Sequence, residues 1–117
     1  MLRLTLLWIL EALHLIAPAH LRTQNCRDMP PPDKLLKDVV HIVGDPSAPK
    51  WATFQCPCGC GTPLLLSLAA NRRPSWSVSR NWSLRPTIKP SVRRTDGCRA
   101  HFWVRNGMVD WCPDSGK

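Results

Sequence analysis

The sequence predicts a small, mainly β domain, a zinc-stabilised antiparallel sheet with hairpins, preceded by an N-terminal helix. Two observations predict this fold class. Cysteines alternate with small residues in the run Cys56-Pro57-Cys58-Gly59-Cys60-Gly61, and short β-type segments bounded by Gly and Pro fill the chain after residue 38. A chain of 117 residues allows one domain, whose small core benefits from a metal.

Residues 1–25 are predicted to form an amphipathic helix that binds a partner or a membrane surface, because apolar residues recur there at three- and four-residue steps. The alternative is a signal peptide, with Arg3 before an apolar run and Ala17-Pro18-Ala19 as a cleavage site. Glu11 and His14 interrupt that run and leave it too short to span a bilayer. We therefore expect a cytoplasmic protein, with weak membrane association through residues 1–25 as an added role.

A proline-rich linker is predicted over residues 26–37, where Met29-Pro30-Pro31-Pro32 cannot continue a helix, and the zinc-binding β domain over residues 38–117. Cys26 lies across this linker and is expected to be a bystander thiol. His41 stands alone in the first predicted strand and is not counted as a ligand. Strands are expected at residues 39–43, 50–54, 64–68, 75–79 and within 82–92.

The last predicted element is a hairpin whose turn is Asn106-Gly107, a pair typical of a two-residue type I′ turn. Counting outward pairs Arg105 with Met108 and His101 with Cys112. Alternation then places one apolar set toward the core, consisting of Phe102, Val104, Val109 and Trp111. The opposite face carries His101, Trp103, Asp110 and Cys112.

A second hairpin centred on Asp96 sets Ser91 opposite His101, within reach of a hydroxyl–imidazole pair. Asp110 is diagonal to His101 on the same face and could orient the imidazole. Nucleophile, base and orienting group are the parts that acyl-transfer chemistry needs, so Ser91, His101 and Asp110 are the candidate catalytic residues.

The candidate metal ligands are Cys56, Cys58, Cys60 and Cys98. Zinc favours thiolates in a closed tetrahedron when its role is structural. Cys98 is the better fourth ligand because a regular strand would point it away from His101, and Arg94 and Arg99 would offset part of the thiolate charge. The alternative is a disulfide-linked domain, since six cysteines is an even number.

Taken together, several motifs resemble a prokaryotic family of small proteins known as a domain of unknown function. They are the run from Trp51 to Gly61 with its C-P-C-G-C-G, Pro90-Ser91-Val92, Gly97-Cys98 with His101-Phe102-Trp103, and Trp111-Cys112, within a match over about residues 38–112. Members of that family occur beside ubiquitin-like modifiers and their activating and conjugating enzymes in bacterial operons.

The resemblance implies a zinc-stabilised peptidase that processes a ubiquitin-like protein or its conjugates, with the motif cysteines at the metal and Ser91 and His101 as catalytic groups. One branch of the family lacks the counterpart of Cys112, in agreement with its exclusion from the metal. Arg93 stands where close relatives have an aromatic residue, which puts contacts on the substrate face in doubt.

Two functions follow from these patterns. The first is a Ser–His hydrolase of a bacterial ubiquitin-like pathway. The second is a non-catalytic zinc module that binds an acidic protein or nucleic acid, since the chain carries a net charge of +8. Its binding residues would be Arg72, Arg73, Arg80, Arg85, Lys89, Arg93 and Arg94.

Overall fold

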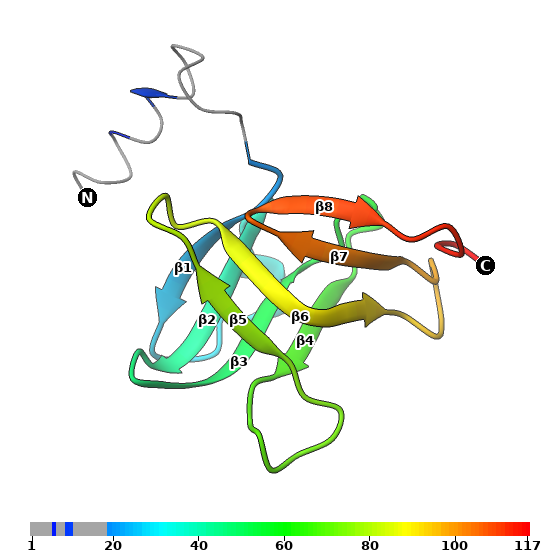
Figure 1. Ribbon diagram of the computed structural model, residues 1–117. Helices are drawn as coiled ribbons and strands as arrows, with labels where there is room; N and C mark the ends of the chain where they lie inside the picture. Colours follow the sequence, from blue (N-terminus) through cyan, green and yellow to red (C-terminus); the bar gives the residue numbers. More distant parts are fainter. Residues whose placement is uncertain (1–5, 7–8, 11–18) are drawn as a thin grey trace.

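The computed structural model describes residues 6, 9–10 and 19–117, which form two four-stranded sheets (Figure 1). The first has the order β1-β2-β3-β4 and the second β5-β6-β7-β8. A short 3-10 helix, η1 (Pro32–Lys34), connects the first two strands. The strands are β1 (Arg22–Cys26), β2 (Val39–Asp45), β3 (Ala48–Gln55), β4 (Pro63–Ser67), β5 (Ser77–Arg80), β6 (Pro86–Arg93), β7 (His101–Arg105) and β8 (Met108–Trp111).

The mainly β prediction is confirmed, but the helix predicted over residues 1–25 is not supported. Most of that range lies outside the described residues, and its last part is strand β1. This strand pairs in parallel with β2, so the first sheet is mixed rather than purely antiparallel. The Asn-, Gln- and Arg-containing β1 carries no alternating apolar pattern, and its strand structure depends on pairing with its neighbour.

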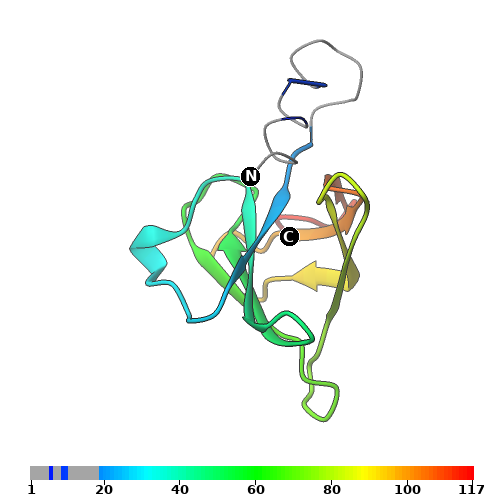
Figure 2. The same cartoon turned by 90° about the vertical axis from the view of Figure 1, so that its left-hand side faces the viewer.

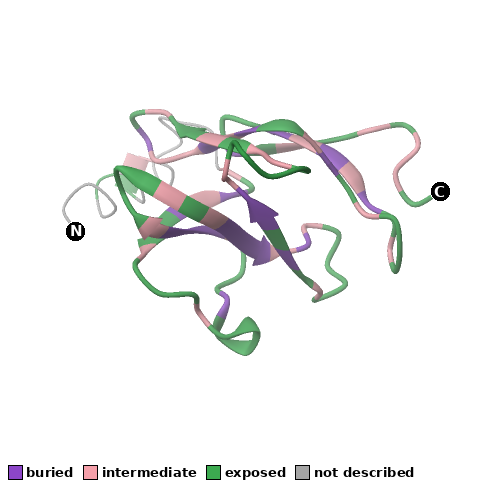
Figure 3. Cartoon of the chain, turned by 90° about the horizontal axis from the view of Figure 1, so that it is seen from below, coloured by how far each residue is buried: buried purple, intermediate pink, exposed green. Residues whose placement is uncertain are grey.

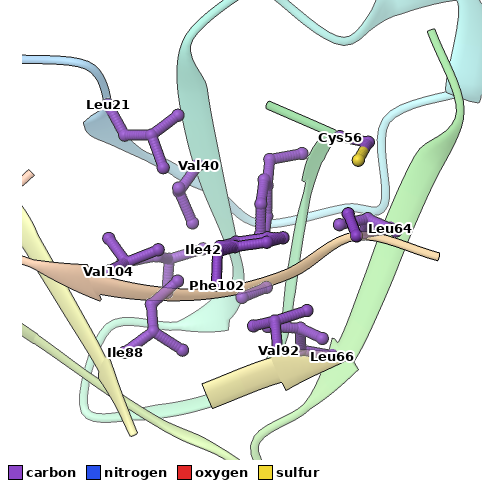
Figure 4. Close-up of a cluster of buried hydrophobic side chains, with 13 residues drawn as sticks. Leu21, Val40, Ile42, Cys56, Leu64, Leu66, Ile88, Val92, Phe102 and Val104 are labelled. Atoms are coloured by element: carbon purple, nitrogen blue, oxygen red, sulfur yellow. The ribbon is translucent and has the colours of Figure 1, made fainter. Parts of the chain in front are cut away.

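The core lies between the two sheets, which occupy opposite sides of the molecule (Figure 2). Phe54 of β3 and Phe102 of β7 are both fully buried and meet edge to face, with ring centroids 6.4 Å apart. Aliphatic side chains from both sheets surround this pair, among them Val40, Ile42, Leu64, Leu66, Ile88, Val92 and Val104 (Figure 4). The connecting loops are mostly exposed or half-buried (Figure 3).

The C-terminal hairpin has the predicted register: Arg105 pairs with Met108 and Phe102 with Trp111. Its turn residues have positive φ angles, 49° at Asn106 and 76° at Gly107, as a type I′ turn requires. The predicted apolar face is only partly confirmed. Phe102 is fully buried, but Trp111, which lies on the edge strand β8, is 44% exposed.

At His101 the β6–β7 register differs from the prediction by two residues, since Arg93 rather than Ser91 lies opposite it, whereas Ile88 lies opposite Val104, as a hairpin centred on Asp96 implies. The loop between the strands turns through positive φ angles at Gly97 and Arg99. A register shift between Ile88 and Val92 adds an irregularity in β6, and Ser91 lies within it.

Candidate active site and metal site

Four cysteine side chains converge at one end of the molecule. Cys56 follows β3, Cys58 and Cys60 lie on the exposed loop after it, and Cys98 comes from the β6–β7 loop. Their sulfur atoms all lie within 4.8 Å of one another. The Sγ of Cys56 is 3.3 Å from that of Cys58 and 3.7 Å from that of Cys98. Zn–S bonds of about 2.3 Å give a tetrahedron with edges of about 3.8 Å, so this spacing fits a four-thiolate zinc site.

Charged and polar neighbours lower the pKa of two thiols in this cluster, Cys60 and Cys98. The Arg94 guanidinium lies 3.1 Å from the Sγ of Cys98 and 3.7 Å from the Sγ of Cys60. The hydroxyl of Thr62 hydrogen-bonds the Cys60 sulfur, and with the Thr62 backbone and the Cys58 thiol it lowers the pKa of Cys60 to about 6. Burial has the opposite effect on Cys56 and Cys58, because it raises the pKa of both thiols. Burial makes an unpaired thiolate unfavourable, and a cation that replaces the thiol protons would stabilise the thiolate form.

A second group of polar side chains lies on the outer face of the second sheet, where Ser91, His101 and Asp114 form a hydrogen-bonded chain. The Ser91 hydroxyl is 3.1 Å from Nε2 of His101, and Nδ1 of His101 is 2.7 Å from an Asp114 carboxylate oxygen. The hydrogen bond with His101 lowers the pKa of Asp114, so the carboxylate is ionised at neutral pH. A hydroxyl, an imidazole and a carboxylate in this order form the geometry of a serine-protease triad.

The backbone fixes each member of this chain. Ser91 lies at the irregularity in β6, and irregularities of this kind reorient side chains beside active sites. His101 is the first residue of β7. Asp114 lies in a turn that begins at Cys112 and is tied back to β7: the Cys112 amide donates to the His101 carbonyl at 2.9 Å, and the His101 amide donates to the Ser115 hydroxyl at 3.0 Å.

A family model described as bacterial ubiquitination-like system serine protease (BubE) matches residues 26–112. The chain belongs to the BubE family. This confirms the resemblance to a family of bacterial ubiquitin-like systems. No curated protein and no solved structure matches the chain.

The BubE match ends before Asp114, whose carboxylate contacts His101 and was not singled out in the sequence. Asp110 was predicted for that role, but its carboxylate pairs with the Arg105 guanidinium at 2.7 Å. Strand alternation applies only within a hairpin, whereas Asp114 lies in the turn beyond it. The Pro113-Asp114-Ser115-Gly116 run was the available signal, since its residue types indicate a turn after the last strand.

A hollow of about 570 Å³ lies beside the nucleophile candidate of this BubE-family protein. Trp76 and Trp103 line it together with Pro90, the residue before Ser91. The Trp76 indole N–H donates to the Ser91 carbonyl at 3.2 Å, which ties the wall of the hollow to the backbone at Ser91. The hollow is mainly apolar in its lining and adjoins the backbone of Ser91.

Cys26 contacts the buried His41, whose Nδ1 is 3.6 Å from the Cys26 sulfur. The His41 Nε2 accepts the Leu36 amide at 3.2 Å, so its Nδ1 carries the proton of the neutral ring. Burial lowers the His41 pKa and favours that neutral form. His41 has no free lone pair with which to deprotonate Cys26, and the pair is structural.

The basic residues that suggested an acidic partner for this BubE-family protein have separate contacts. Arg72 lies over the Trp51 ring, Arg80 contacts Asn25, and Arg93 pairs with Asp114 at 3.4 Å. They do not act as one set, and an acidic partner is not supported. Among the described residues, no helix has the length and hydropathy needed to cross a membrane.

Proposed function

We propose that this protein is a serine protease that cleaves a bacterial ubiquitin-like protein, or conjugates of it, with Ser91 as nucleophile, His101 as general base and Asp114 as the orienting carboxylate. The hydrogen-bonded chain from Ser91 through His101 to Asp114 is the observation that carries the proposal. Membership of a family of serine proteases from ubiquitination-like systems supports the substrate class.

In the proposed reaction, the Ser91 oxygen attacks the carbonyl carbon of the scissile bond while Nε2 of His101 takes the hydroxyl proton. Asp114 holds the Nδ1–H and stabilises the imidazolium that forms. The imidazolium then gives its proton to the leaving amine, and the carbonyl carbon remains bound to Ser91 as an ester. Water activated by the neutral imidazole hydrolyses this ester and restores the hydroxyl.

We also propose that Cys56, Cys58, Cys60 and Cys98 hold one structural zinc ion. The ion supplies a cross-link between the loop after β3 and the β6–β7 loop, which belong to different sheets. Four thiolates around Zn²⁺ leave a double negative charge, and the Arg94 guanidinium offsets part of it. The cluster has no open position for substrate, so the chemistry stays with Ser91 and His101.

The triad assignment is tested by comparing two asparagine variants. Asp114→Asn is expected to reduce kcat by about 10² to 10⁴-fold with little change in KM, because the amide cannot stabilise the imidazolium. Asp110→Asn is the matched control and should leave cleavage unchanged. It removes only the ion pair between Asp110 and Arg105, and both of these side chains are more than half exposed. The measurement is steady-state cleavage of a ubiquitin-like fusion, together with thermal unfolding of both variants.

Loss of activity in Asp110→Asn with none in Asp114→Asn would show that the orienting residue has been misassigned. Equal activity in both variants would mean that no carboxylate assists His101. If Asp114→Asn also lowers the thermal midpoint, the Asp114→Glu variant separates the roles, because it keeps the charge.

A further inference from the structure

Cys112 places a third metal-ligating side chain against the His101–Asp114 pair. One ligand atom from each of His101, Cys112 and Asp114 lies within 4.8 Å of the other two, and all three residues are half-buried. The backbone holds this arrangement, since the Cys112 amide donates to the His101 carbonyl and the Ser115 amide donates to the Cys112 carbonyl at 3.0 Å. The thiol is thus fixed beside the imidazole by the same turn that carries Asp114.

We propose that His101, Cys112 and Asp114 form a second site, for zinc or another thiophilic divalent cation, and that occupation of this site reversibly switches off cleavage. The metal-binding part of the proposal stands on the side-chain cluster alone. The inhibitory part rests on the proposed function. The site is separate from the four-cysteine cluster, with which it shares no residue.

The donor set fits a borderline-soft divalent cation. Imidazole nitrogen, thiolate sulfur and carboxylate oxygen are the three zinc ligand types, and three protein ligands leave a fourth position for water. One thiolate and one carboxylate also neutralise the two charges of the ion, so no net charge is left at the half-buried site. A hard cation such as Mg²⁺ prefers oxygen ligands only and is not expected to bind.

Occupation of this site removes the general base through the imidazole tautomer. In the active arrangement, the single proton of the neutral ring is on Nδ1, shared with Asp114, and Nε2 has the lone pair that accepts the Ser91 proton. A cation on Nδ1 requires that proton to move to Nε2, where it donates to the Ser91 hydroxyl. The Cys112 thiol releases its own proton to solvent, one proton for each ion bound.

Arg93 opposes binding. Its guanidinium lies 3.4 Å from the second carboxylate oxygen of Asp114, and its positive charge disfavours a cation on the same carboxylate. The Arg93 side chain is 56% exposed, so it can turn toward water when the ion enters. The site is therefore expected to bind more weakly than the four-cysteine cluster, and the Arg93→Gln variant is expected to bind more tightly than the wild type.

The test titrates the zinc-loaded, full-length protein with Co²⁺, whose thiolate complexes absorb in the near ultraviolet, and with Zn²⁺ during cleavage assays. The wild type should bind one additional equivalent, and Zn²⁺ should inhibit cleavage until a weak chelator removes it. Cys112→Ser should raise the metal concentration needed for binding and for inhibition by at least about tenfold. Replacing a residue that only contacts a ligand already lowers metal affinity by about tenfold or more. Cys26→Ser is the matched control, since Cys26 lies in neither cysteine-containing group.

The absorption and the activity answer separate questions. If Cys112→Ser binds the additional equivalent as tightly as the wild type, or if the wild type binds none, the second site does not exist. If the equivalent binds through Cys112 but Zn²⁺ leaves cleavage unchanged, the inhibitory part is wrong. If the wild type binds the equivalent but cleaves no ubiquitin-like substrate at any metal concentration, the proposed function fails while the metal site stands.

Discussion

Replacing Cys98 with serine is expected to abolish zinc binding and folding together. Cys98 joins the other three thiols from a loop of the opposite sheet, so a zinc ion bound there would connect the two halves of the fold. Structural zinc contributes on the order of 10 kcal/mol, which is comparable to the whole stability of a small domain. The measurements are zinc content per chain by elemental analysis and the thermal unfolding midpoint by circular dichroism.

The wild type should carry one tightly bound zinc ion per chain and lose its cooperative unfolding transition with a strong chelator. Cys26→Ser is the control, because it removes a half-buried thiol outside the cluster and should retain both zinc and fold. A folded, zinc-loaded Cys98→Ser protein would show that the ligand set is wrong. Equal loss in the two serine variants would instead indicate that any cysteine change destabilises this chain.

Alanine at Ser91 or His101 is expected to reduce cleavage of a ubiquitin-like fusion from the same genome by about 10⁴- to 10⁶-fold. Each substitution disables the same unit, so the double variant should be no slower than either single variant. Zinc content should be unchanged at the tight site, since neither residue belongs to the four-cysteine cluster. Turnover of the fusion and elemental analysis of each variant measure the two effects.

Ser79→Ala, which changes an exposed strand serine of the same sheet, is the matched control and should cleave normally. If His101→Ala loses the tightly bound zinc, His101 is a structural ligand and the Ser–His mechanism is wrong. If Ser91→Ala retains full activity while His101→Ala does not, another nucleophile operates beside the same imidazole.

Local rules predicted the parts of this site that lie within one hairpin or one loop. The Asn106-Gly107 turn determined the β7–β8 register, because a two-residue turn leaves no freedom in pairing. The spacing of Cys56, Cys58 and Cys60 indicated a shared metal site, because residues two apart in one short loop stay close together. These features depend only on neighbouring residues, and their geometry follows from counting.

Features that depend on longer loops were predicted only in part. The Ser91–His101 contact was predicted from a register that is wrong by two residues, and it forms because the irregularity in β6 brings the hydroxyl diagonally to the imidazole. Asp114 lies beyond the last strand, where side-chain direction depends on a turn held by tertiary hydrogen bonds. The parallel pairing of β1 likewise leaves no local signature in its polar sequence.

Cys98 and His101 are separated by only two residues, Arg99 and Ala100, so the proposed metal site and the proposed general base share one short stretch of backbone. Release of the tightly bound zinc ion would free Cys98 and the residues that lead from it into β7. A chelator would then inactivate the protein slowly, at the rate of unfolding, while addition of zinc in excess would inhibit it at once through the second site. By inhibitor profile alone, such an enzyme would be classified as a metalloprotease, although its proposed nucleophile is a serine. Rapid covalent labelling of Ser91 by a serine-directed phosphonate, in the zinc-loaded protein, is the criterion that separates the two classes.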